Sequence, residues 1–128
     1  MFMFNKVFMF TAGLALAISS HADVYLGSYQ GYEYYLLPSK TKQVTRTKYE
    51  VQMERFVAQD KKVDGLAKGS YTLYRRYIEC SNKTVATISW ANYNKHNRLL
   101  DSKKMSHLKY YDIFPRSWGS ALYDEICR

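Results

Sequence analysis

Two cysteines, Cys80 and Cys127, constrain this chain more than any other feature. They are the only cysteines in 128 residues. They also follow an N-terminal segment of the kind that directs export. Exported compartments are oxidising, so a lone pair of thiols there favours a disulfide. Closing a loop of this length is worth roughly 4 kcal/mol in the chain-entropy model. We therefore predict a disulfide that joins the middle of the chain to its C-terminal end.

Redox catalysis and metal binding are the other uses of cysteine, and the sequence argues against both. It contains no Cys-x-x-Cys motif. The two histidines after the export segment, His96 and His107, stand at a spacing that matches no standard zinc site. We therefore expect neither a metal nor a cofactor.

The first 22 residues are typical of a secretory signal peptide. Lys6 supplies the positive charge, Val7–Ile18 is apolar, and small residues precede a cleavage site expected after Ala22. The apolar run is shorter than the ~20 residues that cross a bilayer. Residues 23–128 should therefore form one exported domain without a transmembrane span. Because no lipobox cysteine follows the signal, we do not expect a lipoprotein. The periplasm, the cell surface and the medium all remain open.

The exported part is strongly basic. The chain has 19 lysines and arginines against 11 acidic residues, and only Lys6 belongs to the signal, which leaves a net charge of +7. Such a charge favours acidic partners, including anionic glycans, acidic protein surfaces and lipid headgroups. Nucleic acid is not an expected partner, because the protein is exported.

The tyrosine content predicts a mainly β domain. All 13 tyrosines follow the signal, and aromatic side chains suit a pleated, half-buried surface. Strands are expected over Val24–Tyr29, Tyr32–Leu37, Tyr49–Ala58, Tyr71–Cys80, Thr84–Tyr93 and Leu108–Ile113. Lys40–Lys48 is expected to be an exposed connection or edge, Gln59–Ser70 a loop, and Asn94–Ser106 a polar segment without a strand.

Alternation within two strands predicts which side chains are buried. In the third strand, Tyr49, Val51 and Met53 fall on one face, and Glu50, Gln52 and Glu54 fall on the other. In the hairpin strand Thr84–Tyr93, the spacing by two predicts that Ala86, Ile88 and Trp90 share a face.

The C-terminal end changes to helical spacing. Ser117 is a suitable N-cap, and Trp118, Leu122 and Ile126 form one apolar stripe. A bond from Cys127 would attach this helix to the sheet. The expected fold is thus α+β and mainly β: a single antiparallel sheet of about six strands with a C-terminal helix packed on it.

These features resemble the bacterial surface-adhesin E (protein E) family. The likeness is carried by Tyr77–Cys80, Trp90–Tyr93, Pro115–Ser117, Leu122 and Cys127, and more loosely by Tyr32–Leu37 and Tyr49–Val57. The resemblance implies the same sheet, helix and disulfide. The best-described members are outer-membrane lipoproteins that bind vitronectin, laminin and plasminogen. This chain departs from them because it has no cysteine for lipidation.

The resemblance also implies a binding site. The family's host-binding stretch corresponds to Tyr74, Arg75, Arg76, Tyr77 and Lys83. The alternative is that Arg75 and Arg76 are solvated strand positions with no role in recognition.

The sequence favours recognition over catalysis. No nucleophile with a base, carboxylate pair or phosphate-binding loop stands out, so we expect a non-enzymatic, adhesin-like protein. It would bind host matrix or plasma proteins, or envelope macromolecules. The alternative is a periplasmic accessory protein, or an inhibitor that inserts Gln59–Ser70 into the cleft of a lysozyme or protease. A homodimer is compatible with either function.

Overall fold

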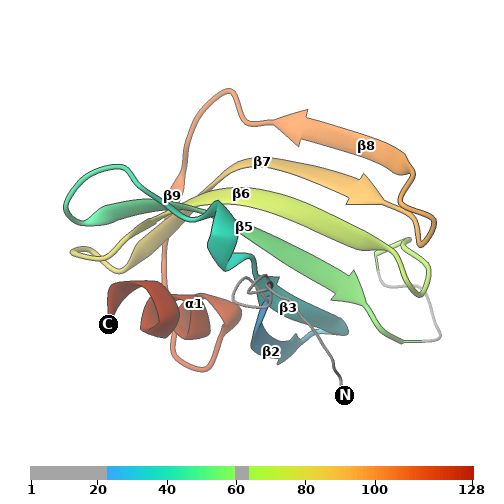
Figure 1. Ribbon diagram of the computed structural model, residues 1–128, viewed down its shortest axis with the longest axis horizontal. Helices are drawn as coiled ribbons and strands as arrows, with labels where there is room; N and C mark the ends of the chain where they lie inside the picture. The colour runs from blue at the N-terminus through green and yellow to red at the C-terminus, as the bar shows by residue number, and fades with distance from the viewer. Residues whose placement is uncertain (1–22, 60–63) are drawn as a thin grey trace, which may run out of the picture.

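The computed structural model describes residues 23–59 and 64–128. The expected signal peptide therefore lies outside the described residues, as do positions 60–63 of the predicted loop. The described residues form one curled antiparallel sheet with helix α1 (Trp118–Cys127) against one face, which we call the inner face (Figure 1). The strands are β2 (Val24–Tyr29), β3 (Tyr32–Leu36), β4 (Lys42–Gln43), β5 (Lys48–Val57), β6 (Tyr71–Glu79), β7 (Thr84–Tyr93), β8 (Leu99–Lys104) and β9 (Tyr110–Asp112).

The sheet is built around three long neighbouring strands, β5, β6 and β7. The main strand order is β2-β3-β5-β6-β7-β8, and all pairs are antiparallel. Two short strands share one side of β5, because β4 pairs with its beginning and β3 with its end. In the same way, β9 pairs with the beginning of β7 and β8 with its end. The predicted fold class is confirmed: the domain is mainly β, with one antiparallel sheet and a C-terminal helix.

Strand β8 was not expected, whereas β4 lies in the segment expected to be an exposed connection or edge; both strands lack a buried face. Every residue of β4 and β8 is exposed, so neither strand shows apolar alternation. Backbone pairing and a hydrogen bond from Asn92 Nδ2 to Asp101 Oδ1, at 3.0 Å, hold β8 to β7 beyond a turn at Asn94. The side-chain Oδ1 of Asn94 accepts hydrogen bonds from the backbone N–H groups of His96 and Arg98, and Asn97 adopts a positive φ of 63°. The hairpin therefore depends on the tight turn and not on the burial of side chains.

A β-bulge overturns the predicted face of β7. The register between β6 and β7 shifts between Arg75 and Arg76, which leaves Ile88 as the extra residue. Ala86 pairs with Tyr77, whereas Trp90 pairs with Tyr74. These partners lie three residues apart on β6 and so point to opposite faces. Ala86 and Trp90 therefore do not share a face, because a bulge inverts the alternation beyond it.

The core lies between the inner face of the sheet and α1. Val51, Met53 and Ile78 are fully buried, together with Leu122 of the helix. The predicted face of β5 is thus confirmed for Val51 and Met53, while Tyr49 is partly buried against the same cluster. Among the described residues, no helix has the length and hydropathy to cross a membrane.

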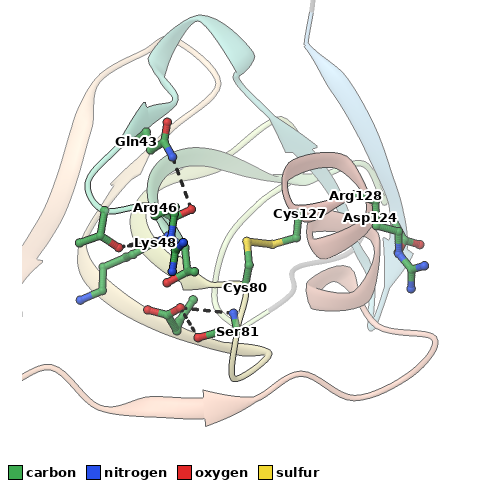
Figure 2. Close-up of a disulfide and its surroundings, with 11 residues drawn as sticks. Gln43, Arg46, Lys48, Cys80, Ser81, Asp124, Cys127 and Arg128 are labelled. Carbon is green, nitrogen blue, oxygen red and sulfur yellow. Dashed lines mark hydrogen bonds and ion pairs between the residues drawn. A yellow bond between two sulfur atoms is a disulfide. The ribbon is translucent and has the colours of Figure 1, made fainter.

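The predicted helix cap and disulfide are both present. Ser117 has an extended backbone conformation, and its Oγ accepts a hydrogen bond from the N–H of Ser120 at 3.2 Å. Cys80, directly after β6, is bonded to Cys127 at the end of α1, with 5.6 Å between their Cα atoms (Figure 2). The two ends of the helix are therefore fixed by a cap and by a covalent bond to the sheet.

Candidate functional site

The five residues expected to bind a partner do not form one surface. Alternation along β6 places Tyr74 and Arg76 on the inner face and Arg75 and Tyr77 on the outer face. Lys83 lies in the β6–β7 turn, where its backbone has a positive φ of 53°. Its Nζ lies 5.2 Å from the ring centroid of Tyr123 on α1. A run that is continuous in sequence is therefore divided between the two faces of the sheet and one turn.

The outer-face pair makes local contacts. Arg75 is exposed, and its Nε and Nη2 both donate to Glu50 Oε2 on β5, at 3.0 and 2.9 Å. Tyr77 lies beneath Lys48, whose Nζ is 5.1 Å from its ring centroid. Exposed ion pairs contribute little to stability, about 0–1 kcal/mol. Arg75 is thus a solvated strand position with an acidic neighbour.

Arg76 is a buried cation held between aromatic rings. Only 7% of it is exposed. Its guanidinium carbon lies 3.8 Å from the ring centroid of Tyr74 and 4.2 Å from that of Trp118. Nε donates to Thr87 Oγ1 at 3.2 Å, and Nη1 contacts Met53 Sδ at 3.4 Å. No carboxylate of the described residues forms an ion pair with it.

A second arginine extends this arrangement along the inner face. The guanidinium of Arg55 lies 4.0 Å from the ring centroid of Tyr32 and 5.3 Å from that of Tyr74. Trp118, Arg76, Tyr74, Arg55 and Tyr32 thus alternate rings with cations, and we call these five residues the inner-face stack. Each desolvated cation–π contact is worth up to about 2 kcal/mol. These contacts offset part of the cost of placing charge in a core.

Burial changes the ionisation of the stack. The pKa of the Arg76 guanidinium is lowered to about 10, chiefly because burial removes it from water. It therefore remains protonated at neutral pH. Burial also raises the pKa of Tyr34, whose ring lies parallel to that of Trp118 with 5.8 Å between centroids. At neutral pH the charged Arg76 guanidinium is thus in direct contact only with neutral groups.

A pocket of about 410 Å³ opens beside Arg76. It lies between the first turn of α1 and the strands β7 and β9. Its apolar walls come from Val85, Ile113, Phe114 and Trp118, while Arg76, Thr87 and Ser117 supply polar groups. Asp112 also lines the pocket and is exposed. The volume falls within the ~300–1,000 Å³ of small-molecule sites.

Exposed aromatic and basic side chains gather around β9. We call this group the β9 surface. It consists of the exposed residues Leu108, Lys109, Tyr110, Tyr111 and Phe114, together with the half-buried Lys48. Tyr111 is 59% exposed and Phe114 69% exposed. Lys48 Nζ lies 5.6 Å from the ring centroid of Tyr110, and Lys109 Nζ lies 5.4 Å from that of Tyr111. A lysine ammonium group therefore lies close to each of the two exposed rings of β9.

The β9 surface wraps around an edge of the sheet. Tyr110 pairs with Ala86, whose side is the outer face, and Tyr111 pairs with Val85 on the inner face. Consecutive aromatic residues of one short strand are therefore presented on both sides. A hydrogen bond with Tyr110 is the main cause that raises the pKa of Lys48, so the lysine stays charged at neutral pH.

Neither the inner-face stack nor the β9 surface was predicted from the sequence, although the sequence contains a signal for each. The run from Leu108 to Phe114 has five apolar or aromatic residues that do not alternate with polar ones, which is unusual for a strand with one solvent-facing side. On β5, Val51 and Met53 lie on the buried face, and Arg55 is the next residue in the same alternation. A cationic residue at a position where the alternation predicts a core residue indicates a buried charge.

Comparison with known proteins adds no relative. No protein-family model, no curated protein and no solved structure matches this chain. Within residues 23–59 and 64–128, no group of three or more His, Cys, Asp or Glu side chains could hold a metal ion.

Proposed function

We propose that this protein is an exported, non-enzymatic binding protein of adhesin type, which recognises acidic macromolecules of host or envelope origin. The observation that carries the proposal is the β9 surface. Large exposed apolar residues that cluster on a small soluble domain are typical of interaction sites. Aromatic residues are enriched in such interfaces. Lys48 and Lys109 add positive charge beside the rings, which favours an acidic partner.

The disulfide supports the exported part of the proposal. Disulfides persist in oxidising compartments and are rare in the cytosol. In this small domain the bond between Cys80 and Cys127 ties the helix to the sheet, as in a scaffold that must hold its shape outside the cell. Vitronectin, laminin, plasminogen and anionic glycans are the partners to test, because they follow from the resemblance and from the net charge of residues 23–128.

The β9 surface replaces the earlier candidate site as the proposed contact. Arg76 is buried, so Arg76→Glu would place a carboxylate in the core and would test folding. Arg75 is exposed but already bonded to Glu50. Lys48 and Lys109 instead lie beside solvent-exposed rings, where a partner can reach both the charge and the apolar surface.

Charge reversal tests the proposal. Lys48→Glu/Lys109→Glu should weaken salt-dependent binding to immobilised heparin and vitronectin by about tenfold or more, because two attractive contacts become repulsive. The matched control is Lys95→Glu/Arg98→Glu, which changes the net charge equally in the β7–β8 turn, beyond the opposite end of β7. Equal weakening by both variants would show that net charge alone drives binding and would refute the β9 surface.

A second variant separates charge from apolar contact. Tyr111→Ser/Phe114→Ser keeps the charge and removes two exposed rings. If the surface acts as proposed, this variant should weaken binding to vitronectin even at high salt, where the electrostatic part is screened. Unchanged binding would remove the aromatic residues from the site.

A further inference from the structure

Arg76 is an unpaired cation in the core, and this suggests a ligand. Burying a charge is costly unless an opposite charge accompanies it. Arg76 contacts a hydroxyl, a thioether and two rings, all of them neutral. Cation–π contacts offset part of the desolvation, but they leave the positive charge itself uncompensated.

The pocket beside Arg76 connects this charge to solvent. Arg76 and Thr87 form part of its lining, and they are the polar groups that β6 and β7 contribute. Trp118 and Gly119, the first residues of α1, also line it. That end of a helix carries the positive partial charge of the helix dipole. Both features favour a negative group at the base of the pocket.

The apolar walls of the pocket indicate the chemistry of the rest of the ligand. Val85, Ile113, Phe114 and Trp118 are apolar and lie around the polar base. A ligand that fits must therefore pair one anionic group with an apolar body. We propose that this pocket binds a small apolar carboxylate, whose carboxylate reaches the Arg76 guanidinium and whose hydrocarbon part lies against these side chains. This site is distinct from the macromolecular contact proposed above, although Tyr111 and Phe114 belong to both.

Asp112 provides an internal check on this assignment. It lines the same pocket, but alternation along β9 places its exposed side chain on the outer face, so its charge acts on a bound carboxylate from behind the pocket wall and is partly screened by water. A bound carboxylate would still be repelled by it. Removing that charge should therefore strengthen the binding of an anion and leave a neutral ligand unaffected.

Paired probes test the proposal on the purified, disulfide-bonded protein. Decanoate and 1-decanol have the same chain but differ in charge, and the fluorescence of Trp118 reports binding in a Trp90→Phe background. Decanoate should bind about tenfold or more tightly than 1-decanol, because a charge-assisted hydrogen bond outweighs a neutral one. Equal affinities, or no binding of decanoate, would overturn the proposal.

Three variants locate the effect. Arg76→Met keeps an apolar side chain between the rings and should reduce the preference for decanoate to within about twofold. Asp112→Asn should tighten decanoate binding by about twofold to fivefold and leave 1-decanol unchanged. Asp23→Asn, which makes the same change of net charge outside the pocket, should alter neither probe.

The Asp112 variant also keeps the proposal testable if Arg76→Met fails to fold. Asp112 is exposed, so its replacement by asparagine leaves the core intact. If Asp112→Asn and Asp23→Asn change decanoate binding equally, the carboxylate does not lie in this pocket and the proposal is refuted. None of these results bears on the heparin and vitronectin assays, which probe Lys48 and Lys109.

Discussion

The disulfide should supply a large share of the domain's stability. Cys80 and Cys127 are 47 residues apart in sequence. For a loop of that length, the chain-entropy model gives a stabilisation of about 4 kcal/mol at 25 °C, because the bond restricts the unfolded chain. The unfolding entropy is about 2.1 cal/mol/K per residue, or ~0.22 kcal/mol/K for residues 23–128. Cys80→Ala/Cys127→Ala should therefore lower Tm by about 18 °C.

The assay is thermal unfolding followed by circular dichroism, with the oxidised protein and the double variant in the same buffer. Because the bond acts mainly on the unfolded state, the two proteins should have the same spectrum at low temperature. A fall in Tm of less than about 5 °C would refute the reasoning from loop closure. A loss of helical signal in the folded variant would show instead that the bond holds α1 on the sheet. Wild-type protein in reducing buffer is the control and should match the variant.

Three further predictions concern the helix and a partly buried carboxyl group of β5. Leu122→Ala should cost about 2–5 kcal/mol in urea unfolding, because Leu122 is fully buried between α1 and the sheet; a loss below about 1 kcal/mol would contradict that packing. Ser117→Ala should cost about 1 kcal/mol by removing the cap to Ser120 N–H, whereas Ser117→Asp should retain the cap. Burial, with a smaller effect from Asp23, raises the pKa of Glu54 above its usual value of 4.5. The ionised carboxylate therefore destabilises the fold above its folded pKa, so Glu54→Gln should raise the unfolding free energy at neutral pH, and the gain should vanish as the pH falls below 4.5. A gain that persists in acid would exclude ionisation as its cause.

The fold was largely predictable because its signals are local. Aromatic-rich composition, with alternation in two of the segments, located β2, β3, β5, β6 and β7, and the N-cap Ser117 located the start of α1. Strand β8 escaped prediction, and β4 was left open as a connection or edge, because neither has a buried face and neither therefore leaves a periodic pattern. The bulge at Ile88 escaped for a related reason, since a bulge is a mismatch between two strands and neither strand records it alone.

The candidate sites were less predictable, because they depend on which residues face each other. Tyr74, Arg75, Arg76 and Tyr77 are adjacent in sequence, yet consecutive side chains of a strand point in opposite directions. The pleat therefore divided the expected site. The pocket beside Arg76 is lined by residues of β6, β7, β9 and α1. No pattern within one segment predicts that these four elements come together.

The sequence by itself determined the mainly β fold, the single cysteine pair, the C-terminal helix and the basic charge. Each of these depends on composition, spacing or capping within one segment. Only the tertiary structure decided that Arg76 is buried between Tyr74 and Trp118, and that the aromatic residues of β9 remain exposed. Burial depends on what packs against a residue. In this protein the residues that cover Arg76 include Trp118, 42 positions further along the chain, and folding alone brings them together.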